Sequence, residues 1–70
     1  MLPGIFDPDE MVFIGSPIDL ISFTNIDTKD DISIDFLEIK TGNASLNKKQ
    51  KLIKEAIFNK RVYFKTVHLK

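Results

Sequence analysis

The pattern of apolar and polar positions begins with a segment that lacks regular periodicity. Residues 1–16 contain the pairs Pro3-Gly4, Asp7-Pro8 and Gly15-Ser16, which are typical of turns. This segment is therefore predicted to be mostly loop. Within it, residues 11–14 favour one short extended piece.

Two predicted strands follow, over residues 18–24 and 32–40. The first is rich in β-branched and aromatic residues, and Pro17 stands at its start, where a missing N–H does least harm. The polar stretch between the two, residues 25–31, has the length of a hairpin connection. The two strands are therefore expected to pair antiparallel.

Apolar residues then recur at helical spacing, at positions Leu52, Ile53, Ala56 and Ile57. Asn47 and Gln50 stand three apart, as a capping box requires, so the helix is predicted to start at Asn47. Asn59 can adopt a left-handed conformation and end it. Residues 62–69 predict a last strand. The order loop–β–β–α–β indicates an α+β unit with a mixed sheet.

Length and composition limit what this chain can be. Seventy residues make one small domain over residues 1–70, and a chain this short buries only about 60% of its unfolded surface. The absence of cysteine excludes disulfides and thiolate metal sites. The sequence shows neither a signal peptide nor an apolar run near the roughly 18 residues that span a bilayer. We expect a soluble, cytoplasmic protein with no membrane segment.

The charge is balanced overall but unevenly distributed. Residues 1–35 hold eight acids and one base, a balance of −7, whereas residues 36–70 hold nine bases and two acids, a balance of +7. Such halves are typical of a molecule with one face that attracts anions. The alternative is an ordinary solvated helix surface, because charge asymmetry alone speaks only to solubility and association.

Candidate chemistry gathers where the two predicted strands meet. Glu38 and Lys40 point to the same side of the second strand, and Asp19 stands near the start of the first. In an antiparallel pair these positions lie close together. Two converging carboxylates suit Mg²⁺ or Mn²⁺, and a nearby lysine could assist an attacking water, as in phosphodiester hydrolysis. The alternative is an incidental ion pair at a strand end, worth about 0–1 kcal/mol.

The residues also match a known pattern. Pro17-Ile18-Asp19 followed by Glu38-Ile39-Lys40 resembles the PD-(D/E)XK nuclease signature. The longer stretches GSPIDLISF, FLEIKTG and SLNKKQKLIKEAI resemble the archaeal-type endonucleases related to Holliday junction resolvases, over roughly residues 2–69. This resemblance implies a restriction-endonuclease-like core. It also implies a magnesium-dependent endonuclease that acts on DNA, branched DNA included, in recombination and repair.

The resemblance assigns roles residue by residue. Asp19 and Glu38 become metal ligands, the Ile39 carbonyl a further ligand, and Lys40 the catalytic lysine. Gln50 either holds a water or phosphate or simply caps the helix. Basic residues on and after the helix are the candidates for contacts to DNA phosphates: Lys48, Lys49, Lys51, Lys54 and Arg61.

One departure from the family pattern changes the expectation. Family members carry a helix before the first strand that brings another Glu near the metal, and this sequence starts at a segment resembling the one after that helix. We therefore expect the catalytic core of a longer nuclease. Two other classes stay open: a non-catalytic nucleic-acid-binding module and a small protein-interaction domain. The chain has more apolar residues than one small sheet and one helix can bury. A missing segment or the second subunit of a homodimer is therefore expected to cover some of them.

Overall fold

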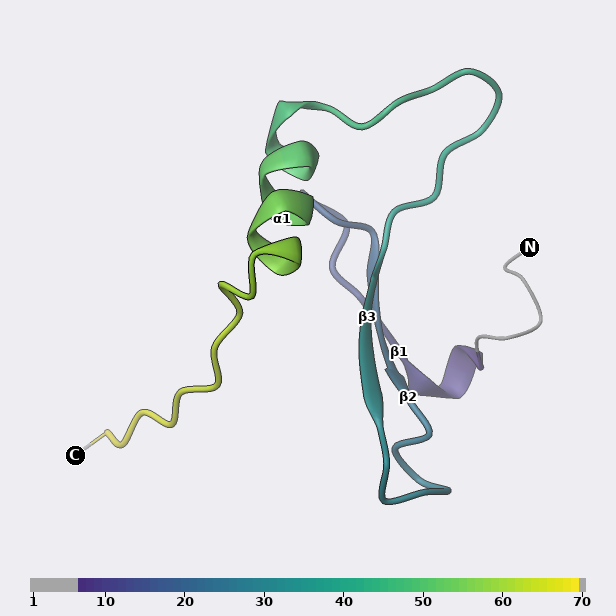
Figure 1. Cartoon of the computed structure of the whole chain (residues 1–70). Helices are drawn as coiled ribbons and strands as arrows, with labels where there is room; N and C mark the ends of the chain where they lie inside the picture. The colour runs from purple at the N-terminus through teal and green to yellow at the C-terminus, as the bar shows by residue number, and fades with distance from the viewer. Residues whose placement is uncertain (1–6, 70) are drawn as a thin grey trace.

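The computed structural model describes residues 7–69 as a small antiparallel sheet with one helix beside it (Figure 1). In chain order, the elements are a short 3-10 helix η1 (Pro8–Glu10), β1 (Met11–Phe13), β2 (Leu20–Thr24), β3 (Ser33–Leu37) and α1 (Lys48–Phe58). The strand order across the sheet is β1-β2-β3. The α+β class is confirmed, but the expected mixed sheet is wrong for the described residues, because both strand pairs are antiparallel. The loop predicted for residues 1–6 lies outside the described residues.

The predicted hairpin is confirmed as β2 and β3, but both strands are shorter than predicted, so Asp19, Glu38 and Lys40 lie just beyond the strand ends. The two strands pair antiparallel from Leu20 opposite Leu37 to Thr24 opposite Ser33. Asn25 begins the connecting turn with φ of 70°, a left-handed conformation that asparagine tolerates better than most residues. The short extended piece expected at residues 11–14 is also present as β1, which pairs antiparallel with the edge of β2 opposite β3.

Both predicted ends of the helix are confirmed. Asn47 accepts a hydrogen bond from the Gln50 N–H (2.9 Å), and Gln50 Oε1 accepts one from the Asn47 N–H (3.0 Å), which completes a capping box. At the other end Asn59 is the C-cap, as predicted, but its φ of −92° shows that it does not adopt the expected left-handed conformation. Lys60 follows with φ of 60°, and the N–H groups of Lys60 and Arg61 donate back to carbonyls of the last helical turn.

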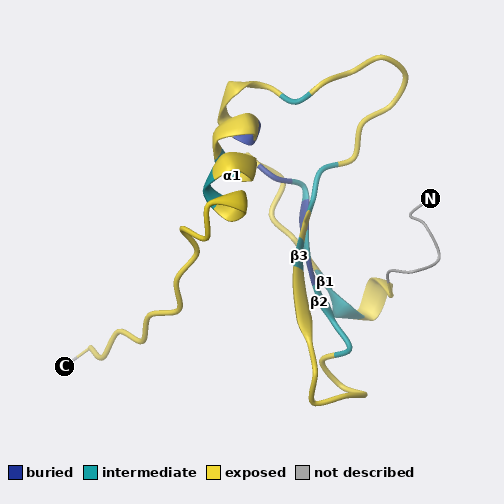
Figure 2. Ribbon diagram, viewed as in Figure 1, coloured by how far each residue is buried: buried dark blue, intermediate teal, exposed yellow. Residues whose placement is uncertain are grey.

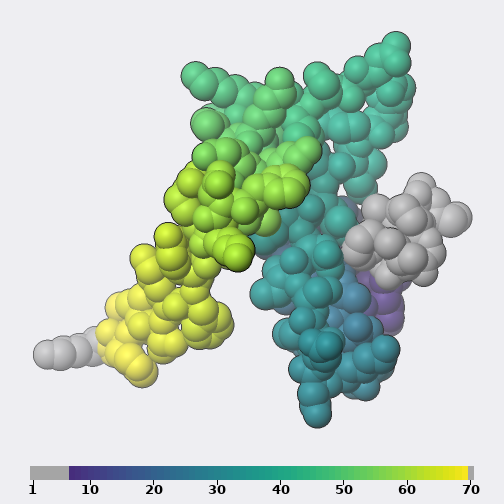
Figure 3. Space-filling model, in the orientation of Figure 1, coloured from purple at the N-terminus to yellow at the C-terminus, as the bar shows by residue number. Residues whose placement is uncertain are grey.

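The predicted last strand, residues 62–69, is wrong in this structure. These residues form no strand, and the segment leads away from the sheet as an arm (Figures 1 and 3). Phe64 is 95% exposed. A β-rich sequence becomes a strand only when a neighbouring strand supplies hydrogen bonds and packing, and among residues 7–69 no strand pairs with this arm. The observed order of regular elements is therefore η–β–β–β–α.

The core is thin and lies where β2 begins (Figure 2). Ile18 and Leu20 are buried, and Ser22 is buried as a polar neighbour. The helix turns Ile53 and Ala56 toward the sheet, whereas Leu52 is 55% exposed, contrary to its expected place on the apolar face. A groove of about 530 Å³ separates α1 from β3. No helix within residues 7–69 is long and apolar enough to cross a membrane.

Leu20 should carry much of the stability. We expect Leu20→Ala to lower the free energy of unfolding by about 2–5 kcal/mol, because a buried leucine leaves a cavity when truncated. Leu52→Ala removes the same atoms from an exposed position and serves as the matched control. Urea titrations followed by circular dichroism compare the two. Equal losses in both variants would show that the core lies elsewhere.

Candidate active site

Asp19 and Glu38 form the next residue pair beyond the β2–β3 ladder. The regular pairing stops at Leu20 opposite Leu37, so the backbone groups just beyond this point are free for side chains. The Asp19 N–H donates to Glu38 Oε1 (3.2 Å), and the Ile39 N–H donates to Asp19 Oδ2 (3.0 Å). These crossed hydrogen bonds hold the two carboxylates side by side at adjoining strand ends.

The Glu38 side chain is only 10% exposed, and its charge is balanced by hydrogen-bond donors. Its Oε1 takes the Asp19 N–H, while its Oε2 accepts a hydrogen bond from Gln50 Nε2. Lys40 Nζ lies 3.2 Å from the same Oε2, with the lysine side chain 31% exposed. A largely buried carboxylate needs such partners, because an unpaired buried charge is strongly unfavourable.

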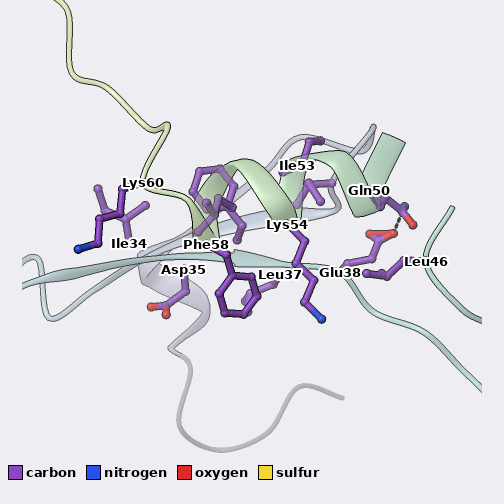
Figure 4. Close-up of a pocket in the computed structure, with 13 residues that line it drawn as sticks. Ile34, Asp35, Leu37, Glu38, Leu46, Gln50, Ile53, Lys54, Phe58 and Lys60 are labelled. Carbon is purple, nitrogen blue, oxygen red and sulfur yellow. Dashed lines mark hydrogen bonds between the residues drawn. The ribbon is translucent and has the colours of Figure 1, made fainter. Parts of the chain in front are cut away.

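Gln50 joins three parts of the chain through one buried side chain. Its Nε2 donates to the Pro17 carbonyl (3.0 Å) and to Glu38, and its Oε1 accepts the Asn47 N–H (3.0 Å). Figure 4 shows Gln50 and Glu38 pointing toward each other at one end of the groove. Its amide is thus engaged inside the protein, and a role in holding a water or phosphate stays a prediction. The capping role is confirmed. The spacing of Asn47 and Gln50 predicts the cap, but no sequence signal predicts the hydrogen bond between Gln50 and Glu38.

The surroundings of Asp19 favour the ionised form of its carboxyl group. The hydrogen bond from the Ile39 N–H lowers the pKa of the Asp19 carboxyl below its ordinary value. The Glu38 side chain and the Lys40 ammonium act in the same direction, and partial desolvation opposes them. An ionised carboxylate at a strand end is a ready ligand for a hard cation.

The donor set fits a cation that keeps much of its water shell. Within residues 7–69, no group of three or more His, Cys, Asp or Glu side chains lies close enough to hold a metal ion. Two neighbouring carboxylates remain, and Mg²⁺ is commonly bound through one or two carboxylates together with waters and substrate phosphates. The Ile39 peptide belongs to the same site, because its N–H is bonded to Asp19.

The basic candidates fall into two groups. The lysines of α1 are exposed at positions Lys48, Lys49, Lys51 and Lys54. The first turn of α1 carries no acid, although acids are favoured at that end of a helix, so positive charge concentrates near Gln50. Arg61 differs, because its Nη2 lies 2.7 Å from Glu55 Oε2 in an exposed ion pair. The sequence predicted Arg61 as a DNA contact but not this pairing.

Comparison with known families identifies the chain. It belongs to the family described as endonuclease related to archaeal Holliday junction resolvase, whose model matches residues 2–69. This match spans nearly the whole chain and confirms the resemblance found in the sequence. No curated protein matches the chain, and no solved structure matches it.

Gln50 should matter for stability as well as for the site. We expect Gln50→Ala to lower the free energy of unfolding by about 1–3 kcal/mol, because it removes the donor to the Pro17 carbonyl and one of the three donors to the Glu38 carboxylate. Lys49→Ala shortens an exposed neighbour in the same helical turn and should change it by less than about 0.5 kcal/mol. Urea denaturation measures both. A harmless Gln50→Ala would mean that the buried amide does not hold α1 to the sheet.

Proposed function

We propose that this protein is a metal-dependent DNA endonuclease. The observation that carries the proposal is the meeting of Asp19 and Glu38, with Lys40 on the Glu38 carboxylate, in a chain of an endonuclease family. An acid pair alone occurs in many proteins. An acid pair with a lysine at adjoining strand ends is one arrangement that can hold a divalent cation and assist phosphodiester hydrolysis.

In this proposal, Asp19 and Glu38 hold Mg²⁺ or Mn²⁺, and the Ile39 carbonyl is a further ligand. The bound cation supplies Lewis-acid stabilisation of the charge that develops on the scissile phosphate. Lys40 offers an ammonium group that can orient the attacking water or neutralise a phosphate oxygen. As the water oxygen bonds to phosphorus and loses its proton, the bond to the departing sugar oxygen breaks and that oxygen takes up a proton, while negative charge develops on the departing oxygen and on the non-bridging phosphate oxygens.

The lysines of α1 are proposed to bind the DNA backbone. They stand in the helix whose first turn contacts Glu38 through Gln50, so phosphates bound there would lie near the acid pair. Lysine positions a duplex through its phosphates without reading sequence. The family description points to branched DNA, and cutting a junction on two strands requires two sites, which a homodimer would supply.

One observation favours a second function, DNA binding without cleavage. The acids that meet within residues 7–69 form a pair rather than a cluster of three. A pair fixes a cation less rigidly, and a displacement of about 1 Å at a reacting centre can cost on the order of a hundredfold in rate. The cleavage experiment below separates the two functions.

We expect Mg²⁺- or Mn²⁺-dependent cleavage of linear, flapped or four-way DNA, and its loss in Asp19→Asn. Asp27→Asn is the matched control, since Asp27 lies in the turn between β2 and β3, away from the site. Broadening of NMR signals by Mn²⁺ should also disappear only in Asp19→Asn. Metal binding that survives this change would remove Asp19 from the site. DNA binding without any cleavage would select the second function.

The salt dependence of DNA binding should report the lysine contacts. Each lost phosphate contact should lower the slope of log affinity against log salt by about 0.9. We therefore expect the double variant Lys48→Ala, Lys49→Ala to flatten that slope by nearly two, as measured by fluorescence anisotropy. Lys29→Ala, in the acidic half, should leave it unchanged. A full slope in the double variant would move the DNA-binding face elsewhere, and no binding at low salt would favour a protein-interaction domain.

A further inference from the structure

The Glu38 carboxylate is already shared among three nitrogen donors before any cation is considered. They are the Asp19 N–H on Oε1, and Gln50 Nε2 and Lys40 Nζ on Oε2. An oxygen of a carboxylate offers about two lone-pair positions, so Oε2 is fully used. A divalent cation on either oxygen would also stand beside the Lys40 ammonium, and like charges repel. A cation therefore cannot join the present arrangement unchanged.

The three donors differ in how firmly they are held. The Asp19 N–H is part of the backbone at the end of β2, and it is fixed by the crossed bonds that continue the sheet. Gln50 is buried and makes two further hydrogen bonds, to Pro17 and Asn47. Lys40 is different, because its side chain is about one-third exposed and its ammonium sits on a flexible stem with Glu38 as its ion-pair partner.

We propose that a divalent cation bound by Asp19 and Glu38 displaces Lys40 from Glu38, while Gln50 keeps its place. This inference rests on the proposed function. Lys40 then has two states. Without a cation it is the counter-ion of Glu38, and with a cation its ammonium is released toward solvent, where a DNA phosphate or the attacking water can meet it. Binding of the cation thus makes the lysine available.

Metal affinity without DNA tests the exchange. Lys40→Met removes the competing ammonium, so Mn²⁺ should bind about tenfold more tightly in a calorimetric titration. Lys60→Met removes the same charge at the other end of the groove, where it does not pair with Glu38, and should change affinity by less than about twofold because of screening by water and salt. Equal gains in both variants, or no gain in Lys40→Met, would overturn the exchange.

A second measurement uses the unaltered protein and so does not depend on whether a variant folds. Acetylation of each lysine, followed by mass spectrometry, should show Lys40 becoming severalfold more reactive when Mg²⁺ is added, with Lys29 in the hairpin turn as internal reference. Unchanged Lys40 reactivity at saturating Mg²⁺ overturns the exchange but leaves the metal site intact. No Mn²⁺ binding by the unaltered protein or by Lys40→Met overturns the metal site of the proposed function, and the exchange with it.

Discussion

The buried amide of Gln50 is the constraint on which the rest of this structure depends. The apolar contact between α1 and the sheet is slight, because Ile53 and Ala56 are only half-buried and a groove remains between helix and β3. Gln50 bridges this gap by donating to Pro17, just before β2, and to Glu38, just after β3. Leaving such buried groups unpaired costs more than pairing them gains. The helix start and the orientation of Glu38 are therefore set by the same hydrogen bonds.

The acid pair owes its position to the end of the strand ladder. Inside the ladder, the backbone amides that face the neighbouring strand are taken by it. One residue beyond Leu20 and Leu37, the regular strand pairing has ended and backbone N–H groups are available to side chains. The Glu38 carboxylate accepts the Asp19 N–H, and the Asp19 carboxylate accepts the Ile39 N–H. Each bond brings a donor dipole to a negative charge, which offsets part of the repulsion between the carboxylates. A strand end can thus keep two acids together where the middle of a strand could not.

The predictable features were those decided by neighbouring residues or by simple strand geometry. The capping box needs only Asn47 and Gln50, and an antiparallel hairpin brings Asp19 to Glu38 whatever else the chain does. The contact between Gln50 and Glu38 was not predictable, because it depends on the path of residues 38–47, which carries no periodic pattern. The strand expected at residues 62–69 failed for a related reason. Its composition favours a strand, but a strand also requires a partner edge, which local sequence does not specify.

The same thin packing ties stability to occupancy of the site. Large apolar side chains of α1 such as Leu52 and Phe58 remain exposed, so the free energy holding α1 against the sheet is small. The carboxylates of Asp19 and Glu38 come from segments far apart in sequence, and the unfolded chain does not bring them together. A ligand that binds only the folded arrangement stabilises it, by about 2.7 kcal/mol at a hundred times its dissociation constant. A cation held by this pair would therefore support the packing of helix on sheet in addition to any chemistry it assists.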